Sequence, residues 1–264
     1  MLAIIAGQGR LPGLIAGAQP APPLICALAG FEPEGLAPDL VFRLETLGTL
    51  LQQLQARGVT EICLAGAVRR PPVDPAAIDT ATRPLIPRLT AALSRGDDGA
   101  LRAVVEIFEA AGFAMRAAQE LRPDLLPVAG CLSSQEPSEE ARADSARGAE
   151  IVAALSAADV GQGCVVLNRQ ALAIESAYGT DWMLASLTAR PDTAGGVLVK
   201  MPKDGQDRRV DLPTIGVTTV EAAAQARLDG ITIEAGGVLV LDRDAVRAAC
   251  DRLGLFLWVR EAAG

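Results

Sequence analysis

The chain has 264 residues, is 50% hydrophobic and carries a formal net charge of −8 at pH 7. This length allows one large domain or two modest ones with real hydrophobic cores. The acidic balance argues against nucleic acid as a partner, because neutralising phosphates needs a basic surface. The chain contains no histidine, which excludes Ser-His-Asp and Cys-His catalysis and His-ligated zinc. Any metal must therefore be held by oxygen ligands, which favour Mg²⁺ or Mn²⁺.

The first half of the chain alternates short apolar runs with amphipathic segments. The apolar runs predict strands, and glycines that follow the segments mark their ends. A further helix begins near Pro12, where proline is tolerated. Strands that alternate with helices indicate a parallel sheet with helices on its faces. The predicted strands are 2–6, 24–28 and 61–65, and the main predicted helices are 46–57 and 101–111.

Between about residues 128 and 146 the composition becomes polar and charged, and the segment contains Pro137. We place a linker at 131–145, between an N-terminal Rossmann-like domain (1–130) and a C-terminal mixed α/β domain (146–264). Ser138 is positioned to cap a helix that continues to about Leu155. The other predicted elements of this half are strands at 164–167, 171–175, 196–200, 231–234 and 238–241, and helices at 181–188, 219–228 and 243–253.

The cellular setting is predicted from cysteine usage and from apolar run lengths. The five cysteines are odd in number and form no CxxC pair, which is typical of a reducing compartment. The run Leu2–Ala6 has no basic residues before it, so it fits a first strand better than a signal peptide. No uncharged apolar run approaches the ~18 residues that span a bilayer. We expect a soluble cytoplasmic protein, which leaves contact with a membrane surface open.

Two candidate ligand sites lie in the first half. Gly7 and Gly9 follow the first predicted strand, where glycines let a backbone approach a phosphate. A full GxGxxG fingerprint would need glycine at position 12, which is Pro12, so classical dinucleotide binding is disfavoured and a turn without a ligand is equally compatible. Arg69 and Arg70 follow the strand 61–65 and are candidates for holding a phosphate or carboxylate, or are simply solvated.

A denser candidate site lies between Glu175 and Gly216. This stretch holds the only two lysines of the chain, Lys200 and Lys203, its only tyrosine and one of its two tryptophans. The other basic side chains are all arginine, so a retained lysine indicates a need for a compact ammonium. The predicted turn at Gly179–Asp181 opens a helix near these cations.

Asp207 and Asp211 add two carboxylates to this stretch. A strand brings residues 207, 209 and 211 to one face, and a helical turn brings residues four apart together. Either arrangement lets two carboxylates converge on one hard cation. Phosphoryl transfer requires such a metal, nearby cations and an oxygen base that orients water. The alternative is a surface hairpin of mixed charges.

Five segments in order resemble the UDP-2,3-diacylglucosamine pyrophosphatases of the LpxI type. The most specific of them reads Lys-Met-Pro-Lys-Asp-Gly-Gln-Asp-Arg-Arg-Val-Asp-Leu-Pro-Thr-Ile-Gly, and the resemblance spans nearly the whole chain. It implies a Mg²⁺-dependent enzyme of lipid A biosynthesis that cleaves UDP-2,3-diacylglucosamine into UMP and 2,3-diacylglucosamine 1-phosphate. It also implies two domains with the ligand between them and a homodimer that contacts the inner membrane surface transiently. The matching segments are 5–12, 65–71, 96–98, 173–181 and 200–216.

The resemblance assigns roles to residues of the dense stretch. Its essential acidic residue falls on Asp211, which would bind the metal or orient the attacking water, with Asp207 and Gln206 as candidate partners. The residues that would face the diphosphate are Lys200, Lys203 and Thr180. Two further candidates for substrate binding are the carboxylates of Glu175 and Asp181. Two alternatives stay open, a noncatalytic lipid or nucleotide carrier and a nucleotide-sugar enzyme of another chemistry.

Overall fold

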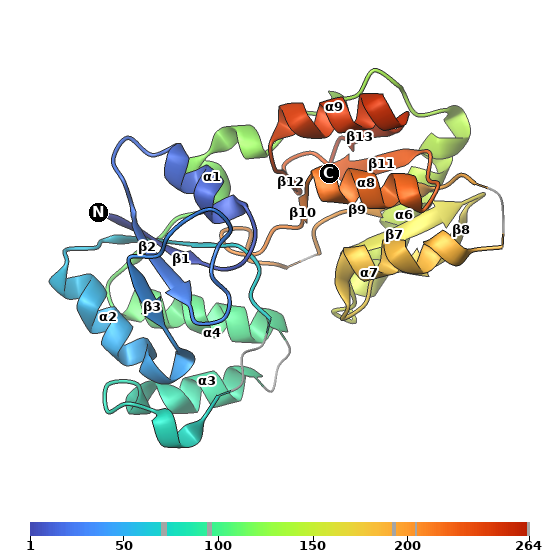
Figure 1. Ribbon diagram of the computed structural model, residues 1–264. Helices are drawn as coiled ribbons and strands as arrows, with labels where there is room; N and C mark the ends of the chain where they lie inside the picture. Colours follow the sequence, from blue (N-terminus) through green and yellow to red (C-terminus); the bar gives the residue numbers. More distant parts are fainter. Residues whose placement is uncertain (70–72, 94–96, 192–193, 204, 263–264) are drawn as a thin grey trace. The chain divides into compact units, whose positions relative to one another are not determined.

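The computed structural model describes residues 1–69, 73–93, 97–191, 194–203 and 205–262 (Figure 1). It divides into two compact units, which confirms the predicted two-domain α/β organisation. Unit 1 comprises Met1–Pro123 and Asp207–Val210, and unit 2 comprises Asp124–Gln206 and Asp211–Gly264. The change of unit at Pro123 precedes the predicted linker 131–145. That segment is packed within unit 2, because Ser138 caps a helix there and Ser145 is fully buried.

Unit 1 contains a five-stranded parallel sheet in the order β3–β2–β1–β4–β5. The strand order reverses at β1, so the carboxyl ends of β1 and β4 flank the place where ligands bind in such sheets. This is the Rossmann-like sheet that the sequence predicts. The strands are β1 (Leu2–Ala6), β2 (Leu24–Leu28), β3 (Leu40–Phe42), β4 (Glu61–Ala65) and β5 (Ala114–Met115), and the helices are α1 (Leu11–Gly17), α2 (Leu47–Ala56), α3 (Ile86–Leu93), α4 (Asp97–Ala110) and α5 (Ala118–Leu121).

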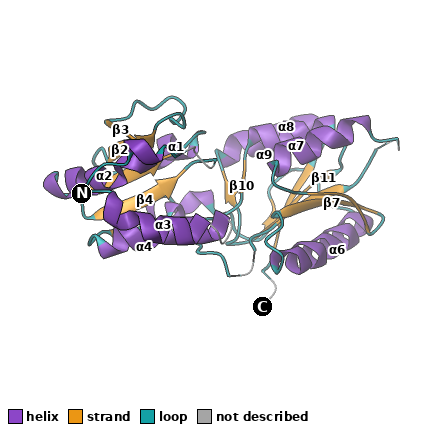
Figure 2. Ribbon diagram, turned by 90° about the horizontal axis from the view of Figure 1, so that it is seen from below, coloured by secondary structure: helices purple, strands orange, loops and turns teal. Residues whose placement is uncertain are grey.

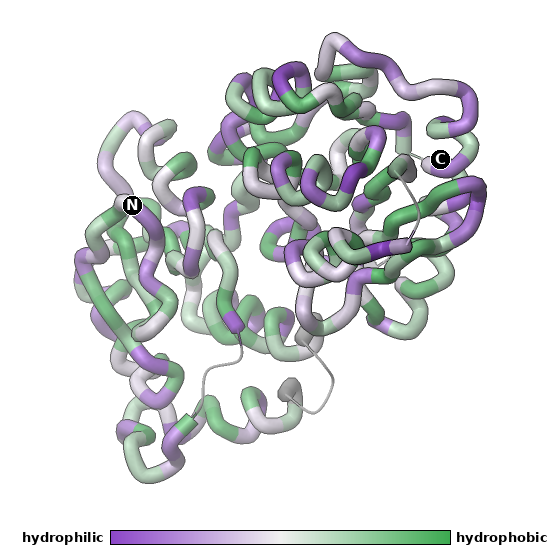
Figure 3. The backbone as a smooth tube through the Cα atoms, turned by 45° about the vertical axis from the view of Figure 1, so that its right-hand side comes forward, coloured by the Kyte–Doolittle hydropathy of each residue, from purple (hydrophilic) through white to green (hydrophobic). Residues whose placement is uncertain are grey.

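Helical spacing of leucines explains the packing of unit 1. Leu47, Leu50 and Leu54 recur on one face of α2 and are almost completely buried beside Phe108 of α4. Figure 3 shows hydrophobic and hydrophilic stretches alternating along the backbone, as expected for elements that each bury one face. Val210, which comes from far along the chain, packs against the same core cluster. The four-residue segment 207–210 therefore completes a unit built mainly from the first 123 residues.

Two strands of the unit 1 sheet each contain a buried thiol. Cys26 of β2 and Cys63 of β4 are fully buried and free of disulfide bonds. Burial away from water disfavours the thiolate and raises the pKa of each thiol to about 12. They act as small apolar side chains, as their positions in apolar runs predict.

A buried glutamate fastens the segment after β3 in unit 1. Glu45 is 2% exposed and accepts two hydrogen bonds from the Arg43 guanidinium, at 2.8 and 3.2 Å. It also accepts a 2.8 Å hydrogen bond from the Asp74 backbone N–H. These bonds to the charged form, first of all those from Arg43, lower the pKa of Glu45 from 4.5 to about 2. The carboxylate thereby joins two segments that are far apart in sequence.

We expect Glu45→Gln to destabilise the protein at neutral pH and much less in acid. Because the folded-state pKa is lowered, the stabilisation is fully present above pH 4.5 and is lost as the pH falls toward 2. The expected loss at pH 7 is about 2 kcal/mol, discounted for the exposed Arg43 partner. Urea unfolding at pH 7 and pH 3 measures it, with Glu106→Gln on the exposed side of α4 as the control. An equal loss at both pH values would contradict the assignment.

Unit 2 contains a six-stranded mixed sheet in the order β6–β13–β11–β9–β7–β8 and a separate parallel pair, β10–β12. Strands β9, β11 and β13 are parallel, and β6, β7 and β8 join antiparallel. The strands are β6 (Gly130–Cys131), β7 (Gly163–Leu167), β8 (Gln170–Ile174), β9 (Val197–Lys200), β10 (Thr214–Ile215), β11 (Gly230–Glu234), β12 (Leu239–Val240) and β13 (Phe256–Arg260).

Helices cover both faces of this sheet. Figure 2 shows α7, α8 and α9 on one side and α6 on the other. Each side has its own buried cluster, with Leu198 and Ile231 facing the three helices and Val199 facing α6. In the part of the chain that the structure describes, no helix combines the length and apolar character needed to cross a membrane. The helices are α6 (Glu139–Ser156), α7 (Gly179–Ser186), α8 (Val217–Gln225) and α9 (Arg243–Leu253).

Candidate functional site

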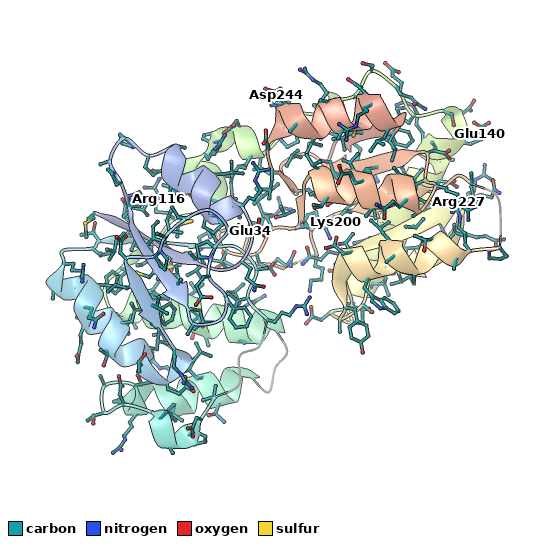
Figure 4. The ribbon with its side chains drawn as sticks, viewed as in Figure 1. Glu34, Arg116, Glu140, Lys200, Arg227 and Asp244 are labelled. Atoms are coloured by element: carbon teal, nitrogen blue, oxygen red, sulfur yellow. The ribbon has the colours of Figure 1, made fainter. Side chains whose placement is uncertain are left out.

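The polar cluster of unit 2 begins at the carboxyl end of β9, where Figure 4 labels Lys200. Lys200 is the last residue of this strand and is only 5% exposed. A buried ammonium is costly unless it has partners. Its partners therefore define the site.

Lys200 has two close side-chain partners. Its Nζ donates to Glu175 Oε2 at 3.0 Å and to Thr180 Oγ1 at 2.5 Å. Glu175 follows β8 and is itself 9% exposed, and Thr180 lies in the first turn of α7. Three residues that the sequence predicts as site residues are thus brought together by β8, β9 and α7.

Two glycines lie against Glu175 and determine the space available to it. A Cβ on Gly163 of β7 would lie 2.8 Å from Glu175 Oε2, and a Cβ on Gly161 would lie 2.1 Å from the Glu175 carbonyl oxygen. The Glu175 N–H also donates to the Gly163 carbonyl at 2.9 Å. A side chain at position 161 would clash with the Glu175 backbone, and one at position 163 would displace the Glu175 carboxylate from its observed position. The backbone of β7 therefore fixes the orientation of the Glu175–Lys200 ion pair.

The segment after β9 forms a second set of polar contacts. The Lys203 ammonium pairs with Asp159, and the Lys203 backbone N–H donates to Gln206 Oε1 at 2.9 Å. Gln206 Nε2 donates to Asp211 Oδ2 at 2.6 Å. Gln206 thus bridges two other predicted site residues and orients the Asp211 carboxylate, which is half-buried.

Asp207 has different surroundings from Asp211. Both of its carboxylate oxygens accept hydrogen bonds from the Arg209 guanidinium, at 2.7 to 3.2 Å. These bonds lower the pKa of the Asp207 carboxyl. Arg209 also pairs with Glu109 of α4 at 2.7 Å. Residues 208–210 form a turn, neither helix nor strand, and Asp207 belongs to unit 1 whereas Asp211 belongs to unit 2.

The remaining predicted residues lie in turns. Asp181 is exposed in the first turn of α7. In unit 1, Gly7 lies very close to the segment that follows β4. A Cβ on Gly7 would be 2.7 Å from the Ala67 carbonyl oxygen. Gly9 has a φ of +91°, a conformation that favours glycine. Arg69 is exposed in the segment that follows β4, and Arg70 lies outside the described residues.

Within the described ranges, no group of three or more Cys, Asp or Glu side chains could hold a metal ion. Magnesium, however, is usually held by one or two carboxylates together with substrate phosphates and water. Asp211, oriented by Gln206, fits that requirement. Asp207, whose two oxygens are bonded to Arg209, fits it less well.

Three residues that contribute to these contacts were not predicted from the sequence. Asp159 pairs with Lys203 across 44 residues of sequence, and Arg209 neutralises Asp207. Gly163 leaves room for Glu175. The spacing of Gly161 and Gly163 around a single residue, just before an apolar run, is a signal of close backbone approach that the sequence does contain.

Comparison with known proteins gives a consistent result over both halves of the chain. A family model described as the LpxI N-terminal domain matches residues 1–125, and one described as the LpxI C-terminal domain matches residues 128–258. The chain is 37% identical over 268 aligned positions to the UDP-2,3-diacylglucosamine pyrophosphatase LpxI of Caulobacter vibrioides. The alignment covers 97% of this chain and 96% of that protein.

Proposed function

Because the chain belongs to the LpxI family, we propose that it hydrolyses the diphosphate of UDP-2,3-diacylglucosamine in lipid A biosynthesis. The products are UMP and 2,3-diacylglucosamine 1-phosphate. The observation that carries this proposal is the full-length identity of 37% to a protein named for this activity. The polar cluster of unit 2 supplies groups that suit a diphosphate, since it combines ammonium, hydroxyl and carboxylate side chains.

Lys200 is the cation best prepared for the diphosphate. An ammonium carries three N–H donors, and Glu175 and Thr180 take two of them. The third donor can point to a phosphate oxygen. Because Glu175 and Thr180 already hold the ammonium, little reorganisation is needed when negative charge develops. Lys200 would therefore stabilise the leaving or attacked phosphate, while Glu175 positions it.

We assign a Mg²⁺ ion to Asp211 in this proposal, with Mn²⁺ as the alternative hard ion. The support is the chemistry of the donors: an oriented carboxylate beside an amide, in a chain without histidine. Bound there, the ion would offset the negative charge of the diphosphate. Asp207 remains paired with Arg209 in this assignment and would help to hold the segment that ends at Asp211.

The acylated substrate implies work at a membrane surface. We propose transient contact with the cytoplasmic face of the inner membrane, where such a lipid is accessible, and a homodimer as the working form. Membership in the family and the acyl chains of the substrate support this setting. A diphosphate site on the protein would then meet the head group of a lipid that stays anchored by its chains.

The test is release of UMP from UDP-2,3-diacylglucosamine by the purified protein, with Mg²⁺ and with EDTA. We expect multiple turnovers with Mg²⁺, loss of turnover in EDTA and recovery when Mg²⁺ is restored. Binding of one substrate per chain without UMP release, in a sample shown to be folded, would indicate a carrier and overturn the proposal. Turnover unaffected by EDTA would overturn the metal assignment and leave the hydrolysis intact.

A further inference from the structure

Two aromatic side chains stand exposed at the start of α7. Tyr178 is 71% exposed and Trp182 is 56% exposed, and their ring centroids lie 5.2 Å apart. They are the only tyrosine and one of two tryptophans in the whole chain. Ile174, at the end of the edge strand β8, is 42% exposed. Large aromatic rings usually bury most of their surface, so this exposure calls for a partner.

The charge of the surrounding segment departs from that of the chain. Residues 169–190 contain two arginines, Arg169 and Arg190, and two acidic residues, Glu175 and Asp181, so their formal charge is 2 − 2 = 0 in a chain of net charge −8. Glu175 is buried and paired with Lys200. The exposed Asp181 is adjacent to Trp182, whereas Arg169 and Arg190 lie at the opposite end of β8 and beyond the far end of α7. The aromatic rings, and not the local charge, are therefore the feature of this surface that suits a bilayer.

We propose that Tyr178, Trp182 and Ile174 form a surface that inserts into the head-group region of a lipid bilayer. Tyrosine and tryptophan combine an apolar ring with a polar group and are enriched at membrane–water interfaces for that reason. This inference rests on the proposed function in one respect: an acylated substrate gives the protein a reason to contact a bilayer.

The surface is directly connected to the polar cluster. Thr180 lies between the two aromatic residues in sequence, and its hydroxyl accepts the 2.5 Å hydrogen bond from Lys200. The start of α7 thus carries aromatic rings toward solvent and a hydroxyl toward the buried ammonium. Insertion of the rings would hold Lys200 near the depth of lipid head groups, where the diphosphate of an anchored substrate lies.

The tryptophan itself provides the test. Trp258→Phe leaves Trp182 as the remaining tryptophan, and Trp258 is partly covered by Arg142 at 4.9 Å. We expect vesicles of phosphatidylcholine and phosphatidylglycerol, free of substrate, to shift the Trp182 emission to the blue. Brominated lipids should quench it. In sedimentation with the same vesicles, Tyr178→Ser/Trp182→Ser should partition about tenfold more weakly than the parent protein.

Controls separate this proposal from its alternatives. Val128→Ser removes another highly exposed apolar side chain of unit 2 and should leave partitioning unchanged. The double variant should lose hydrolysis of vesicle-embedded substrate and keep hydrolysis of a short-acyl analogue dissolved as monomers. Loss of both activities would place the rings in substrate binding instead. A halved mass in light scattering would place them between two copies of the chain, and unchanged emission with vesicles would also overturn the proposal. Since the vesicles contain no substrate, absence of hydrolysis leaves this test intact.

Discussion

Asp211→Asn is expected to lower kcat by about 10²–10³-fold while leaving the fold and substrate binding largely intact. The amide keeps the shape of the carboxylate and can still accept the hydrogen bond from Gln206. It loses the negative charge that would hold Mg²⁺ or orient water. Steady-state release of UMP measures the change in kcat, and isothermal titration with substrate measures binding.

A matched substitution controls for the loss of one negative charge. Asp244 is 87% exposed in its side chain at the start of α9 (Figure 4), so Asp244→Asn makes the same chemical change away from the polar cluster. We expect its kcat to equal that of the parent protein. Parent-like turnover in Asp211→Asn would remove Asp211 from the mechanism. Raising the Mg²⁺ concentration should rescue the turnover of Asp211→Asn only in part.

Lys200→Met is expected to reduce kcat by about 10²–10³-fold and to destabilise the fold by about 3 kcal/mol. The first effect follows from losing a positioned ammonium beside the diphosphate. The second follows because Glu175, 9% exposed, would keep a buried charge without its counter-ion. UMP release and urea unfolding measure the two effects separately.

A second substitution distinguishes catalysis from stability. In Lys200→Met/Glu175→Gln the buried charge is gone, so we expect most of the stability to return while kcat stays low. Recovery of both would show that Lys200 serves the fold alone. Arg57→Ala, which removes an exposed cation at the end of α2 in unit 1, is the control and should change neither quantity appreciably.

Long apolar runs were sufficient to predict most of the fold. The runs 2–6, 24–28 and 61–65 are β1, β2 and β4 with the predicted bounds. Helix α4 begins at Asp97, earlier than the predicted start at Leu101. Strand β13 is absent from the predictions, although its five residues lie between β6 and β11. Strands β5, β6 and β10 have two residues each, too few for any periodicity to show.

The sequence predicted which residues belong to the candidate site, but not which side chains contact one another. Scarcity of residue types indicated Lys200 and its neighbourhood, and the structure does place Glu175 and Thr180 on its ammonium. Pairing depends on tertiary contacts, and spacing alone cannot supply it. Thus the spacing of Asp207 and Asp211 suggested a shared face, whereas in the structure a neighbouring guanidinium binds the first and an amide binds the second.

The segment 207–210 gives this protein a particular order of assembly during synthesis. Val210 packs into the core of unit 1 and Arg209 pairs with Glu109, yet the rest of that unit ends at Pro123. The ribosome must add 210 − 123 = 87 further residues before those contacts can form. At roughly 5–20 residues per second this takes about 4 to 17 seconds. The N-terminal unit therefore cannot complete its contacts until the segment 207–210, which lies beside the predicted catalytic residues in sequence, has been synthesised.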